Sequence, residues 1–388
     1  MIPYGKQQLD AADLAAVQDV LQSNWLTQGP KVPEFEQAIT QQCQTQFAVA
    51  VNSATSALHI ACLALNVGPG DIVWTSPNSF VASANCALYC GAKVDFVDID
   101  IETGNLSITA LSEKLAIAKQ CNSLPKVLIP IHFAGQPCYL KAIANLAEQY
   151  GFKVIEDASH AIGARYQGAP IGNCQYSDIC IFSFHPVKII TCGEGGVATT
   201  NSPELARTMQ MLRSHGITSE ATELTEPSHG VWYYQQQMLG FNYRMTDLQA
   251  ALGVSQLSKL TRFVAERHLL AKWYDDAFAG NTGISPLQQQ PYAYSSYHLY
   301  VVRLLNLNKT QHKDCVQFLR QQGIVGHLHY IPIYLQPYYQ QLGFKAGYCP
   351  QAELYYQQAV TLPLFPGLTA LEQQSVVETL QHFLENTL

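Results

Sequence analysis

Short runs rich in β-branched and aromatic residues alternate with helical patterns between Phe47 and about Thr200, and this alternation constrains the fold more than any other feature. Several runs are apolar on both faces, as expected of strands buried between two layers of helices. Segments such as LKAIANLAEQYG (140–151) predict helices that connect successive strands. We therefore predict an α/β fold with a mostly parallel sheet, whose ligands bind at the carboxyl ends of the strands. The predicted strands cover residues 47–52, 71–77, 93–99, 126–133, 152–158, 178–184 and 196–200.

The second part of the chain has a different pattern. After the segment 240–260, a long helical stretch is predicted to reach about Gly280, and the turn-rich segment 281–296 indicates a change of structural unit. Beyond it, the sequence predicts a small α+β unit from the segments 297–304, 312–323, 324–334 and 371–386. We expect an N-terminal arm, a large α/β domain and a small C-terminal α+β domain, with the bounds 1–12, 13–250 and 251–388.

The chain has an unusually low share of charged residues. Of its 388 residues, 13% are charged and 48% hydrophobic, so much of the surface must be covered by uncharged polar side chains or by a partner subunit. We expect a homo-oligomer for this reason. The net charge is −7 and the basic residues are scattered, which argues against binding to nucleic acid or to an anionic membrane surface.

The eleven cysteines contain no Cys-x-x-Cys pair, and many lie in apolar contexts such as HIACLAL and SDICIFSF. Buried thiols in a reducing cytoplasm explain this better than disulfides or a zinc site. The first 21 residues lack the order of a signal peptide and predict a short arm followed by an amphipathic helix. The longest apolar-looking segment, 47–71, is interrupted by polar residues, so we expect a cytoplasmic protein without a membrane helix.

Two strand ends carry residues that could bind a ligand. In KVIEDASHAIGA, Asp157 ends a predicted strand and His160 follows; the aspartate either caps a helix or holds a cation. In VNSATSALHIACLAL, Ala54 and Thr55 lie between a strand and a helix, where free backbone N–H groups form a phosphate site. Ordinary helix capping explains the same residues, so the sequence leaves both interpretations open.

A third strand end, SFHPVKIITCGEGG, carries Ser183 and Lys188. A lysine in a desolvated turn is partly neutral, and a neutral amine can form a Schiff base with a carbonyl. The glycines match neither the mononucleotide loop G-x-x-x-x-G-K nor the dinucleotide motif G-x-G-x-x-G. A lysine, a strand-end carboxylate and a phosphate site together predict pyridoxal 5′-phosphate (PLP), because that cofactor needs all three.

These stretches resemble the DegT/DnrJ/EryC1/StrS family of sugar aminotransferases, which has the aspartate aminotransferase fold (fold type I). The resemblance extends from LTQGPKVPEFEQAI (26–39) to HLHYIPIYLQPYY (327–339), nearly the whole chain. The lysine motif combined with the run Asn-Tyr-Arg-Met-Thr-Asp (242–247) is highly specific. The resemblance implies a PLP-dependent transferase that works as a homodimer with active sites at the subunit interface.

The resemblance also implies roles for particular residues. Lys188 would attach the cofactor and carry a proton between substrate and cofactor, Asp157 would pair with the pyridine nitrogen, and His160 would lie near the ring oxygen. The other residues implied to bind the cofactor's ring or phosphate are Ala54, Thr55, Phe80, Ser183 and, from the neighbouring subunit, Asn242. The residues implied to bind the substrate are Thr27, His185, Tyr243, His329 and Tyr330.

Within the family, the sequences of several segments most closely resemble the transaminase of pseudaminic acid biosynthesis. This resemblance implies L-glutamate as amino donor and a UDP-linked 4-keto-6-deoxy-N-acetylhexosamine as acceptor. Bacillosamine-like or perosamine-like sugars are alternatives. A PLP-dependent sugar dehydratase is disfavoured because related dehydratases replace the lysine with histidine, and a non-catalytic regulator is the remaining alternative.

Some of these residues also have a purely structural interpretation. Phe80 could be part of the core, since aromatic residues in α/β proteins are usually packing residues. His132 and His185 could be structural or pocket-lining residues. His327 and His329 alternate as in a strand, but a metal site would need a further ligand, and no metal is predicted. Cys192 stands where many relatives have threonine.

Overall fold

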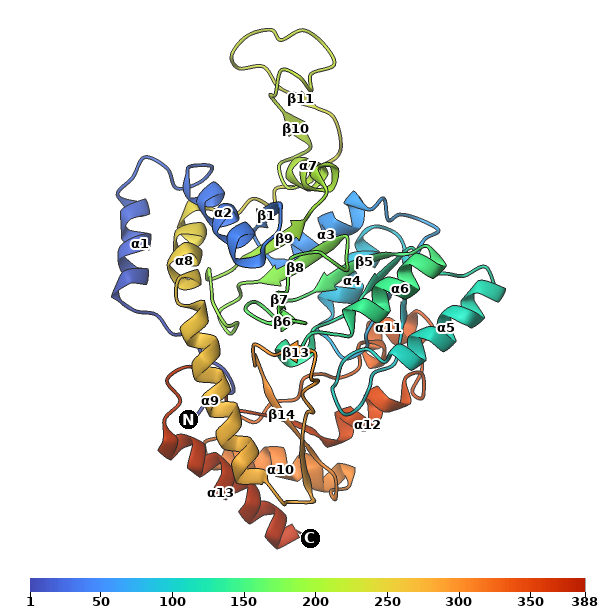
Figure 1. The fold of residues 1–388 in the computed structure, drawn as a ribbon, viewed down its shortest axis with the longest axis vertical. Coiled ribbons are helices and arrows are strands. Elements are labelled where there is room, and N and C mark those ends of the chain that lie inside the picture. The colour runs from blue at the N-terminus through green and yellow to red at the C-terminus, as the bar shows by residue number, and fades with distance from the viewer. Residues whose placement is uncertain (388) are drawn as a thin grey trace.

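The computed structural model describes residues 1–387 and is built around a seven-stranded sheet with the order β1-β9-β8-β5-β4-β2-β3 (Figure 1). All seven predicted strands are present, and the sheet is mostly parallel, as predicted. Only β9 runs antiparallel to its neighbours, β1 and β8. The strand bounds are β1 Phe47–Val51, β2 Ile72–Thr75, β3 Lys93–Phe96, β4 Val127–Ile129, β5 Lys153–Asp157, β8 Ile179–Ser183 and β9 Gly196–Thr200.

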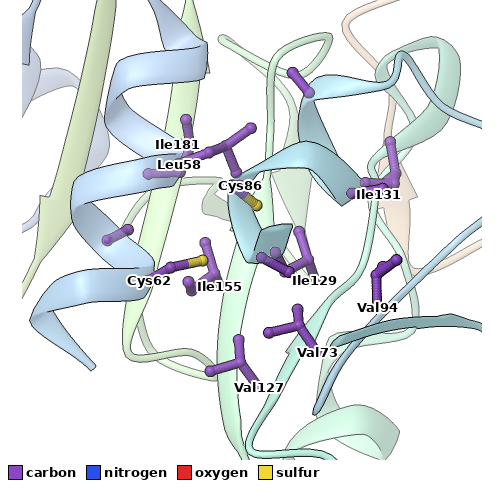
Figure 2. Packing of buried hydrophobic residues seen from close by; sticks show 14 of the residues in the cluster. Leu58, Cys62, Val73, Cys86, Val94, Val127, Ile129, Ile131, Ile155 and Ile181 are labelled. Carbon is purple, nitrogen blue, oxygen red and sulfur yellow. The ribbon is translucent and has the colours of Figure 1, made fainter. Parts of the chain in front are cut away.

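Helices cover both faces of this sheet, because successive strand residues point to opposite faces and both sets are apolar. Val49 and Val51 belong to the core on one face, whereas Ala48 and Ala50 belong to the core on the other. Figure 2 shows the first core, where strand residues such as Ile155 pack beneath two helices. The helices of that face are α3 Ala54–Ala64, α4 Ala82–Tyr89 and α7 Pro203–Leu212. Those of the other face include α2 Lys31–Cys43, α5 Ile108–Gln120 and α6 Leu140–Tyr150.

The C-terminal part forms the predicted α+β unit around a separate core. Its antiparallel sheet has the order β12-β14-β15, with bounds Ile284–Pro286, Tyr300–Leu304 and Ala359–Leu362. The helices of this unit are α9 Leu260–Phe278, α10 Lys309–Gln321, α11 Pro337–Gln341, α12 Pro350–Gln358 and α13 Ala370–Thr387.

One expectation about this part is confirmed and one needs correction. The long helical stretch predicted after residue 260 is α9, which is separated from α8 (Asp247–Leu257) by a turn at Ser258 and Lys259. The segment 324–334 is not a strand: His327 forms only an isolated bridge to Thr361. The domain bounds stay a prediction, and α8 spans the expected boundary at residue 250.

The remaining elements are short. The N-terminal arm pairs Ile2 with Ile324 before α1 (Ala11–Leu21) begins. A hairpin of β10 (Ile217–Thr218) and β11 (Gln235–Gln236) protrudes from the body of the molecule (Figure 1). A small sheet consists of β6 Arg165–Tyr166, β7 Ala169–Pro170 and β13 Ala293–Tyr294.

The cysteines behave as expected. All eleven are free thiols, and only Cys121 is exposed.

Among residues 1–387, no helix is both long and apolar enough to cross a membrane.

Candidate active site

A cavity of about 1090 Å³ lies at the carboxyl ends of β1, β5 and β8, where the α/β pattern predicts a ligand site. It brings together most of the predicted site residues although they are far apart in the sequence. The predicted residues that line it are Ala54, Thr55, Phe80, Asp157, His160, Ser183, His185, Lys188, His329 and Tyr330.

Lys188 lies in the turn after β8, where its backbone N–H donates to the carbonyl of His185 (2.9 Å). Its side-chain amine has no hydrogen-bond or ion-pair partner within residues 1–387. Burial lowers the pKa of Lys188 to about 8, an effect that the negative charge of Asp157 opposes. A substantial fraction of the amine is therefore neutral near physiological pH, as a nucleophilic lysine requires.

Asp157 ends β5 and is held at both carboxylate oxygens. Oδ2 accepts a hydrogen bond from the Ser83 hydroxyl (2.7 Å), and Oδ1 accepts one from the Ser159 backbone N–H (3.1 Å). The helix-cap interpretation is wrong, because the next regular element after Asp157 is the short strand β6. Asp157 is thus a buried carboxylate at the cavity wall, in position to face a cationic group.

The N-terminus of α3 provides the predicted phosphate site. Ser53 caps the helix by accepting the N–H of Ser56 (3.1 Å). The backbone N–H groups of Ala54 and Thr55 have no acceptor within the described chain, and both residues line the cavity. Capping and anion binding are therefore compatible here, since different groups perform them.

Phe80 is 61% exposed although it is a large hydrophobic residue, and it lines the cavity. The interpretation of Phe80 as a core residue is therefore wrong. Its exposed ring fits a role in covering an aromatic cofactor.

His160 is buried beside the cavity. Its Nε2 lies 3.2 Å from the Tyr330 hydroxyl, and its ring centroid lies 4.4 Å from that of His298. Burial, together with the charge of Lys188, lowers the pKa of His160 well below its usual range, and burial raises that of Tyr330. Both side chains are therefore neutral in this hydrogen bond, and Nδ1 of His160 has no partner within the described chain.

His327 and His329 lie on the same side of their segment, as predicted, with ring centroids 4.6 Å apart. Tyr4 of the N-terminal arm packs edge-on against both, at 5.1 Å from each. All three line the cavity. Within residues 1–387 no three metal-ligating side chains are grouped to hold an ion, so the pair gains no further ligand. Among the other lining residues, Nε2 of His185 lies 3.9 Å from the Glu194 carboxylate.

Three predicted residues do not line the cavity of this chain. Thr27 forms an isolated bridge with Thr246, and Asn242 forms one with Ser214. The Tyr243 hydroxyl lies 3.1 Å from Nδ1 of His59. A role for Asn242 through the neighbouring subunit stays a prediction, and so do the substrate roles of Thr27 and Tyr243.

His132 lies in the core, away from the cavity lining. Its Nε2 is 2.7 Å from Glu156, and its Nδ1 accepts the backbone N–H of Cys138 (3.1 Å). The occupied Nδ1 makes His132 a neutral imidazole that donates to the Glu156 carboxylate. This arrangement agrees with a structural role.

The Cys192 position is also close-packed, because a β-carbon on Gly253 would stand 2.7 Å from the Cys192 sulfur.

Several cavity residues were missed by reasoning from the sequence. The signal for Ser83 was its spacing of four from Ser79 at a helix start, which puts both hydroxyls on one side. Ser159 and Glu194 lie in the segments of Asp157 and Lys188 but were not singled out. Tyr4, Gln249 and Gln336 carry no local signal, because distant segments bring them to the cavity.

These features fit PLP. Lys188 would hold its aldehyde carbon, Asp157 its ring nitrogen, and the free N–H groups of α3 its phosphate. The fit at the phosphate end rests on close packing, because a β-carbon on Gly196 would stand 2.5 Å from the Ala54 nitrogen and displace the helix. Nδ1 of His160 is a further polar atom of the site that has no hydrogen-bond partner within the described chain.

Comparison with known proteins agrees with this interpretation. The model of the DegT/DnrJ/EryC1/StrS aminotransferase family matches residues 7–381. The spore coat polysaccharide biosynthesis protein SpsC of Bacillus subtilis is 34% identical, over 99% of this chain and 97% of its own length. The UDP-4-amino-4,6-dideoxy-N-acetyl-beta-L-altrosamine transaminase of Campylobacter jejuni is 35% identical, over 99% of this chain and 98% of its own.

Solved structures agree as well. Helicobacter pylori PseC, an aminotransferase involved in the biosynthesis of pseudoaminic acid, has a TM-score of 0.90 and 32% identity, covering 99% of both chains. The PLP form of the putative sugar aminotransferase Spr1654 from Streptococcus pneumoniae has a TM-score of 0.90 and 30% identity, covering 100% of this chain and 99% of that chain. The chain belongs to the DegT/DnrJ/EryC1/StrS aminotransferase family and is an aminotransferase that uses PLP.

Proposed function

We propose that this enzyme transfers the amino group of L-glutamate to C4 of a UDP-linked 4-keto-6-deoxy-N-acetylhexosamine. The products are 2-oxoglutarate and UDP-4-amino-4,6-dideoxy-N-acetyl-β-L-altrosamine. The second product is an aminated sugar of pseudaminic acid biosynthesis. One observation supports amino transfer above all: the Lys188 amine has no partner in the described chain, and the Asp157 carboxylate in the same cavity is held by hydrogen bonds. The 35% identity to the Campylobacter jejuni transaminase supports the sugar.

PLP supplies an aldehyde that takes up the amino group and a ring that withdraws electrons from the reacting carbon. In our proposal the residues of the chain bind it and move protons. Lys188 Nζ removes a proton from the α-carbon of glutamate and later delivers one to C4 of the sugar. Its lowered pKa suits both steps, because an amine that titrates near neutral pH can accept and release protons.

The other side chains hold charge and exclude water. The Asp157 carboxylate stabilises positive charge at the ring nitrogen, and its burial strengthens this pairing. The N–H groups of Ala54 and Thr55 bind phosphate oxygens. Phe80 would cover one face of the ring, and the Tyr330 hydroxyl holds the His160 ring through its hydrogen bond with Nε2.

The substrates also support a homodimer. Glutamate and a UDP-sugar are both anionic, yet Lys188 is the only lysine or arginine among the residues that line the cavity of the described chain. A second subunit would supply the missing cations and amides, and Asn242 is the residue proposed to reach across. The low share of charged residues in the chain agrees with a surface that is covered by a partner subunit.

Other UDP-, dTDP- or GDP-linked 4-keto sugars are the second candidate, since SpsC, which is 34% identical, is named for spore coat polysaccharide biosynthesis. Purified protein with PLP and glutamate should therefore be tested against a panel of such keto sugars. Our proposal predicts 2-oxoglutarate release and a product mass change of amination, with the highest kcat/KM for the UDP-linked N-acetyl sugar. Dehydration would give a product lacking a hydroxyl, and ligand binding without glutamate consumption would indicate a regulator.

Product stereochemistry separates the close alternatives. NMR of the aminated sugar should show the amino group at C4 in the L-altro configuration. An equal preference for dTDP- or GDP-linked sugars would contradict the proposed substrate while leaving the aminotransferase activity intact.

A further inference from the structure

The Asp157 carboxylate is connected to a short chain of hydroxyl groups that the reaction steps above do not use. Ser83 Oγ lies 2.7 Å from Asp157 Oδ2, and Ser79 Oγ lies 2.9 Å from Ser83 Oγ. Ser83 is 1% exposed and Ser79 is 5% exposed. Both residues belong to the cavity lining.

The direction of these hydrogen bonds follows from the acceptors. The single Ser83 hydroxyl proton goes to the carboxylate, because a bond to a charged acceptor is shorter and stronger than its alternative, the Phe80 carbonyl at 3.4 Å. Ser79 must then donate to Ser83. Each hydroxyl polarises the next, so the chain places a strengthened donor on Asp157.

These donors also fix the plane of the carboxylate. Ser83 occupies one oxygen and the Ser159 N–H the other, so rotation about the Asp157 side chain would break one bond or both. The remaining lone pairs are free to face the ring nitrogen of PLP. A carboxylate that is already oriented loses less entropy when it pairs.

The turn that carries the hydroxyls also carries Phe80. The Ser83 backbone N–H donates to the Phe80 carbonyl (3.3 Å) where α4 begins. One turn, residues 79–83, therefore sets both the ring that covers PLP and the donor that orients Asp157.

We propose that Ser83, supported by Ser79, is a positioning residue that holds the Asp157 carboxylate in the orientation that pairs with the pyridinium nitrogen of PLP. The proposal rests on the use of PLP and not on the identity of the sugar. It acts through Asp157, because neither hydroxyl is assigned a reacting atom.

The test compares S83A and S79A with S76A, a matched control. Ser76 is also 1% exposed and lies in the same stretch of sequence, but its hydroxyl accepts only the Asn78 N–H. Each apoprotein is titrated with PLP, and the ring nitrogen of ¹⁵N-labelled PLP is observed by NMR. We expect S83A to raise the PLP dissociation constant about tenfold, the size of one lost charge-assisted hydrogen bond, and S79A about threefold.

The ¹⁵N shift distinguishes positioning from a merely structural role. S83A should move the ring nitrogen towards its unprotonated value, S83T should restore the wild-type shift, and S76A should change neither measurement. A folded S83A protein with wild-type affinity and shift would overturn the proposal. If S83A does not fold, a folded S79A protein with wild-type affinity and shift would overturn the proposal equally, since S79A removes the polarising donor.

The same measurements separate this proposal from the proposed sugar. PLP binding and the ¹⁵N shift need no sugar substrate, so a wrong sugar assignment leaves them unaffected. Loss of PLP binding by the wild-type protein would instead contradict the cofactor itself.

Discussion

Gly196 at the start of β9 lies directly against Ser53 at the start of α3: a β-carbon on Gly196 would stand 2.4 Å from the Ser53 carbonyl carbon. The backbone of one strand thus sets the position of the helix N-terminus that we assign to phosphate binding. The glycine is required by close approach, since its φ is not positive.

Gly196→Ala should weaken PLP binding. The added methyl group must displace the N-terminus of α3, which moves the N–H groups of Ala54 and Thr55. We expect the PLP dissociation constant to rise at least tenfold, and the free energy of unfolding to fall by about 1–3 kcal/mol as for other overpacked sites. Titration with PLP and urea unfolding measure the two effects. Gly68→Ala is the control, because nothing lies within 4 Å of its added β-carbon, and an equal effect there would contradict this account.

Lys188 should make the stability of the apoprotein depend on pH. Its pKa is lowered from 10.5 to about 8, so between these values the unfolded chain binds more protons than the native one, and stability rises with pH. Below pH 8 both states are protonated and the full cost of burying the charge remains. Lys188→Met should therefore be more stable than wild type at pH 7, by about 1–3 kcal/mol, with a difference that shrinks towards pH 10.5.

The lowered pKa also governs cofactor loading. The rate at which PLP attaches covalently to Lys188 should rise with pH and level off above about 8, because only the neutral amine reacts. Borohydride reduction followed by mass spectrometry locates the attachment site. Attachment to any other lysine in the Lys188→Met protein, at the wild-type rate, would show that the assignment is wrong.

Phe80→Ala should reduce PLP affinity without destabilising the apoprotein. The side chain is 61% exposed, so its removal leaves no cavity in the core, whereas loss of an aromatic stack of about 1.4 kcal/mol weakens binding about tenfold. Thermal unfolding of the apoprotein and PLP titration separate the two effects. Ile117→Ala, at a residue 64% exposed on α5, should change neither. A large loss of stability in Phe80→Ala would instead support the interpretation of Phe80 as a core residue.

His132→Ala should destabilise the fold and spare the chemistry. The substitution leaves the buried Glu156 carboxylate with one hydrogen-bond donor fewer, which costs about 3 kcal/mol. Urea unfolding measures the loss, and kcat per PLP-loaded site should stay within about twofold at low temperature. A large fall in kcat at unchanged stability would instead give His132 a role in proton transfer.

Much of the fold could be read from the sequence because it is encoded locally. A buried parallel strand is apolar on both faces, so all seven strands of the main sheet were predicted. The long helix α9 was predicted as well, from the helical pattern that follows residue 260. The irregular course of His327 to Tyr330 was missed, because alternation predicts which residues share a side and not whether a neighbouring strand is present.

The site divides in the same way. Lys188, Asp157 and the α3 N-terminus each follow a strand, and the carboxyl ends of parallel strands meet at one edge of a sheet, so the order of residues predicted their meeting in one cavity. The exposure of Phe80 could not be predicted, because a phenylalanine is found both in hydrophobic cores and in the walls of ligand cavities. The neutral state of His132 likewise depends on Cys138, whose N–H reaches it only in the folded chain.

By itself, then, the sequence determined the α/β architecture, the PLP chemistry and the residues at the strand ends, because these depend on periodicity and on short motifs. Only the tertiary structure decided how those residues are supported: the Ser83 donor on Asp157, the close approach of Gly196 to Ser53, and the partnerless amine of Lys188. These features depend on which segments, far apart in the sequence, lie within a few ångströms of each other in space. Hydrogen bonding and desolvation act only at such close contact.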